Sequence, residues 1–365
     1  MIPLCIPEMS GNEWKYVKEC FDTNWVSSVG KYVNLFEDKF AAYVNAKKAV
    51  VTMNGTSALE LALRTLGVGE GDEVIVSSMT FISPVNTIKY VGAEPVFADV
   101  CRDTYVMDAE KIEELITEKT KAIIPVHIYG HPVDMDKLME IANKHNLYVI
   151  EDATEALGSE YKGQKAGTIG HIGCFSFNGN KLITTGAGGM LVTNNEELAN
   201  RAKYLSTQTK TVLDNGAFYH DEIGHNFRMP NVLAAMGVAQ LERVEEFLNI
   251  KIENAKYYNE LLKETKGITT PIEKENNKNC FWLYSILVGD DYKLTRDELI
   301  QKLKENGIES RPFFMPVHEM PPYVNCKHGD MSLTDEIAKK GINLPSSVSL
   351  NKEQIDKICS IINMQ

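Results

Sequence analysis

Residues 49–66 of the chain read AVVTMNGTSALELALRTL, and this stretch decides the fold. Its first five residues are mostly apolar or β-branched and predict a short strand. Asn54-Gly-Thr-Ser57 follow as turn formers, and from Thr56 to Leu66 the apolar residues recur at helical spacing. A strand that passes through a tight turn into an amphipathic helix is typical of an α/β protein.

The same alternation of strands and helices continues along the chain. Strands are expected at 73–77, 94–98, 122–126, 147–151, 173–177 and 189–193, and helices at 84–91, 108–118, about 134–145 and from 196. Alternation of this kind requires crossover connections. We therefore expect an α/β fold with a mainly parallel sheet that is covered by helices on both faces.

The last third of the chain has a different pattern. A loop rich in His, Asn and Gly is expected at 210–230 and a long helical region at about 231–265, followed by a strand at 281–288, a helix at 295–305, a Pro-rich loop at 311–323 and a final helix from 351. We expect two domains. Residues 1–250 would form a large domain with the parallel sheet, and residues 251–365 a smaller α+β domain.

Composition argues against several classes of function. The 365 residues carry a formal net charge of −12, which disfavours general binding to nucleic acid or to anionic membranes. The longest apolar stretches are far shorter than the ~20 residues that span a bilayer, and residues 1–8 lack the features of a signal peptide. The seven cysteines are scattered, so neither disulfides nor a thiolate metal site is expected. We expect a cytoplasmic protein.

Ligands of α/β sheets collect where strands meet the following loops, and the first such junction suits an anion. Gly55 allows a tight turn, and the N–H groups and hydroxyls of Thr56 and Ser57 face outward at a helix N-terminus. A phosphate would fit there. An ordinary helix N-cap is the alternative interpretation of this segment.

Two further junctions carry an acid and a lysine. Asp152 follows the strand at 147–151, where a carboxylate can pair with a protonated pyridine nitrogen; a helix N-cap is again the alternative. Lys181 lies between a buried strand and the Gly-rich segment 184–189, where its amine can lose a proton and attack an aldehyde. A single lysine is usually a solvated surface residue. Its spacing from Asp152 and the anion site upstream favour a reactive amine.

Several motifs together resemble the DegT/StrS family of sugar-nucleotide aminotransferases, which are enzymes of fold type I that depend on pyridoxal phosphate (PLP). The motifs are Asn54-Gly-Thr-Ser-Ala58, Glu151-Asp-Ala153, Phe175-Ser-Phe-x-x-x-Lys181-x-x-x-x-Gly186-x-Gly-Gly189 and Asn226-Phe-Arg-Met229. Their order and spacing match the family over nearly the whole chain, from Gly11 to Phe314.

The resemblance implies a PLP-dependent transferase fold of type I, with PLP as the cofactor. Lys181 would be the Schiff-base lysine, and Asp152 would pair with the pyridine nitrogen. Thr56, Ser57 and Ser176 would hold the cofactor phosphate. No metal is expected at this site.

Four more positions complete the comparison with the family. Phe81 would stack on the cofactor ring. Asn226 would reach the phosphate from a neighbouring subunit, which implies a homodimer with the active site at the subunit interface. Ala187 stands where many members have glutamate, so any role of that glutamate is absent. Glu155 stands where Gln or His is common, and a protonated Glu155 could still donate a hydrogen bond to the cofactor.

Segments 11–30 and 177–181 look most similar to family members that act at C4 of 4-keto-6-deoxy sugars. The resemblance implies amino transfer from L-glutamate to C4 of a UDP- or GDP-linked 4-keto-6-deoxyhexose, with a 2-acetamido group expected, for cell-surface glycan or nonulosonic acid biosynthesis. A 3-keto-sugar aminotransferase of the same family is the alternative. Candidate contacts to the nucleotide sugar, for which loop packing is the alternative interpretation, are Trp25, Ser27, Ser28, Arg311, Phe313 and His318.

Other classes of protein fit less well. The glycines of segment 67–71 precede a strand, whereas a dinucleotide-binding fingerprint must follow one. His127 and His131 have the spacing of zinc ligands on a helix, but Pro125 and Pro132 predict a strand end and a loop. A non-catalytic protein on this fold would be expected to lack the lysine, the aspartate or the phosphate loop, and all three are present.

Overall fold

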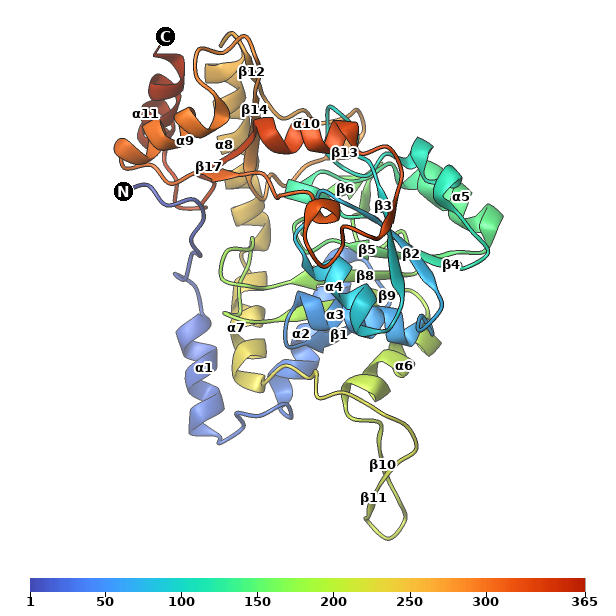
Figure 1. Ribbon diagram of the computed structural model, residues 1–365. Helices are drawn as coiled ribbons and strands as arrows, with labels where there is room; N and C mark the ends of the chain where they lie inside the picture. Colours follow the sequence, from blue (N-terminus) through green and yellow to red (C-terminus); the bar gives the residue numbers. More distant parts are fainter. Residues whose placement is uncertain (365) are drawn as a thin grey trace.

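The computed structural model describes residues 1–364, and a sheet of eight strands forms its centre (Figure 1). The strand order is β1-β9-β8-β5-β4-β2-β3-β16. All neighbours pair in parallel except β9, which is antiparallel to both β1 and β8. The expected α/β fold with a mainly parallel sheet is therefore confirmed. The strands are β1 (Lys48–Thr52), β2 (Glu73–Ser77), β3 (Glu94–Ala98), β4 (Thr120–Ile124), β5 (Tyr148–Asp152), β8 (Ile172–Ser176), β9 (Gly189–Thr193) and β16 (Lys327–His328).

Helices pack against this sheet through apolar stripes. The β1–α3 unit shows the principle: the side chain of Asn54 caps α3 by accepting a hydrogen bond from the Ser57 N–H at 2.8 Å, and α3 then packs on β8 and β9. The helices of this part are α1 (Glu13–Asp22), α2 (Lys31–Val44), α3 (Gly55–Thr65), α4 (Ser83–Tyr90), α5 (Met135–His145), α6 (Glu196–Ser206) and α7 (Asn231–Leu241). No helix within residues 1–364 is both long and apolar enough to cross a membrane.

The C-terminal segment forms a second apolar cluster around a small sheet in the order β12-β14-β17-β15. Its elements are α8 (Val244–Leu262), β12 (Ile268–Thr269), β14 (Tyr284–Val288), α9 (Arg296–Glu305), β15 (Arg311–Pro312), η4 (Val317–Glu319), α10 (Ser332–Lys340), β17 (Gly341–Leu344) and α11 (Lys352–Asn363). Ile2, at the start of the chain, packs in this cluster. We propose that this unit is the smaller domain, with the boundary at residue 250 lying within α8; residue 365 lies outside the described residues.

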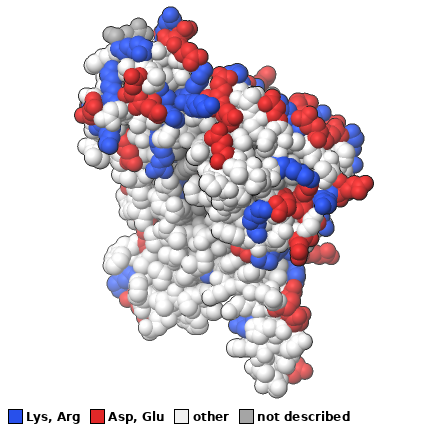
Figure 2. Space-filling model, in the orientation of Figure 1, with Lys and Arg blue, Asp and Glu red and all other residues white. Residues whose placement is uncertain are grey.

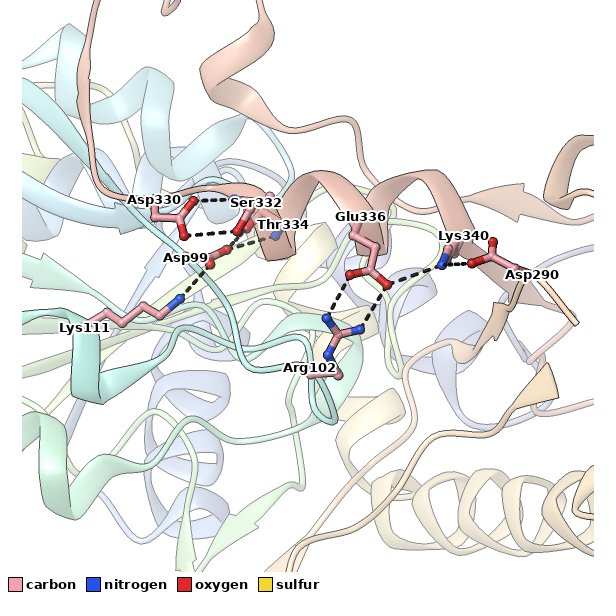
Figure 3. Close-up of polar contacts among 9 residues, drawn as sticks. All are labelled: Asp99, Arg102, Lys111, Asp290, Asp330, Ser332, Thr334, Glu336 and Lys340. Atoms are coloured by element: carbon pink, nitrogen blue, oxygen red, sulfur yellow. Dashed lines mark hydrogen bonds and ion pairs between the residues drawn. The ribbon is translucent and has the colours of Figure 1, made fainter. Parts of the chain in front are cut away.

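Helix α10 fastens the C-terminal segment to the edge of the large sheet (Figure 3). The N–H and Oγ1 of Thr334 both donate to Oδ1 of the buried Asp99, at 2.9 and 2.7 Å. Arg102 donates two hydrogen bonds to Glu336, at 3.0 and 2.8 Å. A bidentate arginine–carboxylate pair of this kind is geometrically specific. These contacts hold α10 beside β3.

Four expected elements differ from the structure. The helix expected at 108–118 is wrong: two 3-10 turns occur there, η1 (Ala109–Lys111) and η2 (Glu113–Leu115). The Thr117 hydroxyl donates to Glu73 at 2.7 Å, and the Thr117 N–H donates to Thr120 Oγ1 at 2.9 Å. These bonds fix the chain at Thr117 on the path that leads into β4. A continuous helix to residue 118 is not compatible with that path.

The long helical region at 231–265 is two helices, because the chain turns at 242–243 and Arg243 has non-helical angles (φ −115°, ψ 6°). Helix α7 packs on α1 and α2, whereas α8 packs on α11, so the two helices pack in different parts of the core.

The expected loop at 210–230 contains a projecting hairpin, β10 (Lys210–Val212) and β11 (Phe218–His220) (Figure 1). The strand expected at 281–288 begins only at Tyr284, since Phe281 has a left-handed φ of 47°. A small third sheet pairs β13 (Asn277–Lys278) with β6 (Glu160–Tyr161) and β7 (Gln164–Lys165), and a further 3-10 turn is η3 (Ile128–Gly130).

Candidate active site

A cavity of about 360 Å³ opens where the parallel strands end, as expected for ligand binding in an open α/β sheet. Residues at the ends of β1, β2, β5 and β8 line one side of it, and residues of the C-terminal segment line the other. The residues predicted from the sequence that line this cavity are Thr56, Phe81, Asp152, Glu155, Ser176, Lys181 and Arg311. One cavity thus contains the proposed acid, lysine and anion site together.

Lys181 reaches this cavity from the turn that follows β8. Its backbone N–H donates to the carbonyl of Asn178 at 3.0 Å, which tightens the turn. Its side chain is 13% exposed, and Nζ lies 3.7 Å from Oε1 of Glu155. Nζ also lies 3.8 Å from the centroid of the Trp282 ring. The amine is therefore enclosed between a carboxylate and an aromatic face.

Asp152 is the last residue of β5 and is buried. One carboxylate oxygen accepts a hydrogen bond from the Thr154 N–H at 3.1 Å. Burial raises the pKa of Asp152, while the bonds from Thr154 and the positive charge of Lys181 oppose that rise. A carboxylate in such a place is strongly stabilised by any cation that enters the cavity.

Glu155 is equally buried and faces Lys181 from the loop after β5. Its Oε2 accepts a hydrogen bond from the Tyr129 N–H at 2.8 Å. Burial raises the pKa of Glu155 to about 7, although the charge of Lys181 opposes this shift. Glu155 can therefore exchange a proton near neutral pH, which a glutamine at this position could not do.

The titration of Glu155 predicts a pH dependence of stability in the cofactor-free protein. The folded state binds the Glu155 proton between pH 4.5 and about 7, whereas the unfolded state has released it. The free energy of unfolding should therefore fall as pH rises through this range, with Glu155 contributing about 1 to 3 kcal/mol of the decline. Urea denaturation at pH 5 and pH 8 measures it. Glu155→Gln should remove this share of the decline, and an identical pH dependence in the variant would contradict the assignment.

The anion site combines a helix N-terminus with small side chains. Thr56 Oγ1 lies 2.9 Å from Ser83 Oγ, and both residues line the cavity with Ser176. A Cβ at Gly55 would approach the Ser176 Cβ to 2.9 Å, so only glycine leaves this space open. Ser57 does not line the cavity, and its N–H is occupied by the side chain of Asn54. The interpretation as a helix cap is confirmed, with Asn54 as the capping residue; Gly55 and Thr56 line the cavity, and the phosphate site stays a prediction.

Other predicted residues lie away from this cavity. Asn226 pairs with Thr207 at the base of the projecting hairpin and does not line the cavity of its own chain. Phe313 is buried against Tyr129 with ring centroids 4.8 Å apart, and its neighbour Phe314 lines the cavity instead. His318 is bonded through Nδ1 to Ser78 Oγ at 2.7 Å.

The loop of Trp25, Ser27 and Ser28 packs near the start of α7, where the Ser27 carbonyl accepts a hydrogen bond from the Asn231 N–H. It contributes no residue to the cavity of its own chain. The zinc alternative finds no support. His127 precedes a 3-10 turn rather than lying on an α-helix, and its Nε2 is bonded to Glu151 at 2.9 Å.

Comparison with known proteins decides the class of this site. A family model described as the DegT/DnrJ/EryC1/StrS aminotransferase family matches residues 7–363. The chain belongs to this family. It is 45% identical to the GDP-perosamine synthase of Escherichia coli O157:H7, with 99% of this chain and 98% of that protein aligned. It is 43% identical to the GDP-perosamine synthase of Caulobacter vibrioides, over 99% and 97%.

Solved structures support the same family assignment. The Streptococcus pneumoniae protein Spr1654 in its PLP form is 29% identical and superposes with a TM-score of 0.91 over 99% of this chain and 97% of that one. The chain is thus a PLP-dependent sugar-nucleotide aminotransferase.

The cavity of this aminotransferase fits PLP by three independent features. A buried carboxylate with a raised pKa, Asp152, suits a protonated ring nitrogen. Gly55 and Thr56 leave space and donors for a phosphate at the N-terminus of α3. Lys181 places an enclosed amine in the same cavity, which is the group that an aldehyde cofactor requires.

Trp282, Phe314 and Ser83 are among the cavity residues that were not predicted from the sequence. Trp282 lies in a stretch expected to be a strand, Phe314 lies in the expected Pro-rich loop, and Ser83 comes directly before an expected helix, where it resembles a cap. Only the fold brings them to the ends of the parallel strands. The aromatic run at 281–284 was the one available signal for Trp282, and it fitted a buried strand equally well.

Proposed function

We propose that this enzyme transfers the amino group of L-glutamate to C4 of a nucleotide-linked 4-keto-6-deoxyhexose. The observation that carries the proposal is the identity of 43% and 45% to two GDP-perosamine synthases over almost the full length of each chain. The same observation favours a GDP sugar over a UDP sugar. The 2-acetamido group expected from the sequence, and a role in nonulosonic acid biosynthesis, stay predictions.

The proposed roles follow from the geometry of the cavity. When bound, PLP withdraws electrons from the carbon that bears the amino group and so makes its proton acidic. Lys181 would take that proton on Nζ and return it, since its amine is enclosed and lines the cavity. Asp152 would hold the ring nitrogen in its protonated form. Glu155 would donate or accept a hydrogen bond beside Lys181, with a proton that exchanges near neutral pH.

The substrate would enter between the sheet and the C-terminal segment. Phe81 and Phe314 face each other there with ring centroids 5.9 Å apart, and Phe81 is 55% exposed, so a ring can stack on it. Arg311 lines the same side and supplies a cation for a carboxylate or phosphate. We propose Arg311 as an anion-binding residue. Trp25, Ser27, Ser28, Phe313 and His318 stay predictions.

A small panel of substrates tests the proposal. The purified enzyme, PLP and L-glutamate would be incubated with GDP- and UDP-linked 4-keto-6-deoxyhexoses that carry either a hydroxyl or an acetamido group at C2. Mass spectrometry of the amino-sugar products should give the highest kcat/KM for a GDP-linked sugar. The proposal fails if none of the four is aminated. Amination of a 3-keto sugar alone would support the alternative function.

We also propose that the enzyme is a homodimer in which Asn226 acts in the partner's active site. Asn226 lies outside the cavity of its own chain, next to the projecting hairpin. Trp14, Phe21 and Trp25 are exposed around α1, with 75%, 59% and 55% of their surfaces accessible. Figure 2 shows few charged side chains on the part of the surface where α1 and α7 lie. An apolar face of this kind is typical of a subunit interface.

A mixture of two inactive variants tests this arrangement. Lys181→Ala and Asn226→Ala subunits would be unfolded together and refolded at equal concentrations. If Asn226 acts across the interface, one site in each hybrid dimer is intact, and about a quarter of wild-type activity should return. If Asn226 acts within its own chain, no hybrid site is intact. Activity no higher than in the separate variants would contradict the proposal, and light scattering would verify the dimer mass.

A further inference from the structure

Trp282 contacts the side chain of Lys181 and the backbone beside it. The Lys181 Nζ lies over the indole, 3.8 Å from the ring centroid. The indole N–H donates to the carbonyl of Asn180 at 2.7 Å, and Asn180 is the residue directly before Lys181. Trp282 comes from the C-terminal segment, about a hundred residues away in sequence. One side chain thus fixes both the amine and the turn that carries it.

The position of Trp282 is set in turn by Lys251 on α8. Lys251 is 4% exposed, and its Nζ donates to the carbonyl of Trp282 at 3.0 Å and to the carbonyl of Ser346. The Trp282 ring also lies nearly parallel to the buried Tyr129 ring, with an angle of 16° and centroids 6.5 Å apart. A buried ammonium is costly unless its hydrogen bonds are satisfied. Lys251 therefore lies where two backbone carbonyls, those of Trp282 and Ser346, require a hydrogen-bond donor.

We propose that Trp282 is a positioning residue that seats the free amine of Lys181, and that Lys251 holds Trp282 in place for this task. The inference rests on the proposed role of Lys181. During amino transfer Lys181 must leave the cofactor, and its amine must then stay close to the carbon whose proton it moves. A lysine side chain has four rotatable bonds and scatters over many rotamers unless something holds its end.

The contacts of Trp282 and Glu155 can hold the amine of Lys181 in this position. The aromatic face attracts the amine when it is protonated, by a cation–π contact that is strongest for tryptophan and in a desolvated site. Glu155 encloses the amine from a second direction, 3.7 Å away. The bond from the indole to Asn180 limits movement of the turn. Loss of the indole should therefore slow proton transfer by Lys181 and leave substrate binding largely unchanged.

Three variants separate these contributions. Trp282→Leu removes the aromatic face and the indole N–H. Trp282→Phe keeps a face and removes only the N–H. Lys251→Met keeps the length of the side chain and removes the two bonds to carbonyls. Tyr90→Leu, at an exposed position at the C-terminal end of α4, is the matched control. Circular dichroism would verify that each variant is folded.

Two measurements report on the seat. The first is the steady-state rate of the reaction with L-glutamate, measured with unlabelled glutamate and with glutamate deuterated at Cα. Trp282→Leu should lower kcat about two- to thirty-fold, the range that a desolvated cation–π contact spans, with little change in KM and a larger deuterium isotope effect. The kcat values and isotope effects of Trp282→Phe and Lys251→Met should lie between those of Trp282→Leu and the wild type.

The second measurement uses the cofactor-free protein. Acetylation of Lys181, followed by peptide mass spectrometry, should be at least about two-fold faster in Trp282→Leu than in the wild type, because the amine is no longer covered. The proposal is overturned if Trp282→Leu matches Tyr90→Leu in both the isotope effect and the rate of acetylation. That outcome would not affect the proposed role of Lys181. Full activity of Lys181→Ala would overturn both that role and the positioning role of Trp282.

Discussion

Replacement of Lys181 by alanine is expected to lower kcat for amino transfer by about 10³-fold or more, while the fold is unchanged. The reason is that Lys181 supplies the amine within the cavity that can move the substrate proton, and loss of a positioned general base and acid costs about 10²- to 10⁴-fold. Loss of the proposed covalent attachment to PLP would add to this cost. Steady-state kinetics with glutamate and a 4-keto sugar measure the effect.

The control for this variant is Lys256→Ala, a change at a lysine on α8 whose side chain is 67% exposed. It should leave kcat unchanged. Sodium borohydride treatment followed by peptide mass spectrometry should attach the cofactor to the peptide of Lys181 in the wild type and in Lys256→Ala. Retention of more than a tenth of wild-type activity by Lys181→Ala would contradict the assignment.

Replacement of Asp152 by asparagine is expected to weaken PLP binding by about 150- to 5,000-fold. Asp152 is buried, and its pKa is raised because no bulk water stabilises its charge. Its proposed partner is the protonated ring nitrogen, and breaking a buried pair by removal of one charge costs about 3 to 5 kcal/mol. Asparagine keeps the size and can still accept the hydrogen bond from Thr154. The change therefore removes the charge with little other disturbance.

Titration of the cofactor-free protein with PLP, followed by absorbance, measures the affinity. The matched control is Asp136→Asn, which neutralises an exposed carboxylate paired with Lys162 at 2.5 Å. Its PLP affinity should equal that of the wild type. Equal affinities in Asp152→Asn and Asp136→Asn would show that Asp152 does not bind the ring nitrogen.

Local sequence patterns were sufficient for seven of the eight strands of the large sheet, whereas the edge strand β16 (Lys327–His328) was not expected. The stretch from Ala49 to Leu66 contains the strand, the turn and the helix of one unit, and the structure has them at 48–52 and 55–65. Asp152 ends β5 and Lys181 follows β8, and these two strands are neighbours in the sheet. Because strand ends meet at one edge, the order of strands and loops in the sequence predicts that such residues lie close together.

Contacts between distant segments were not predictable in this way. Trp282 comes just before β14 of the small sheet, yet it lines the same cavity as Lys181 and contacts its amine, and no pattern near residue 282 predicts this contact. Phe313 and Phe314 are adjacent and chemically alike, so the sequence could not indicate which of them faces the cavity. The break between α7 and α8 likewise depends on two different packing partners.

The most direct test of the account is the position of nitrogen in the product. The enzyme, PLP and ¹⁵N-labelled L-glutamate would be incubated with a GDP-linked 4-keto-6-deoxyhexose, and the purified product would be analysed by NMR. The account predicts that the ¹⁵N is bonded to C4 of the sugar, with one 2-oxoglutarate formed for each amino sugar. Nitrogen at C3, or formation of 2-oxoglutarate without labelled sugar, would contradict it.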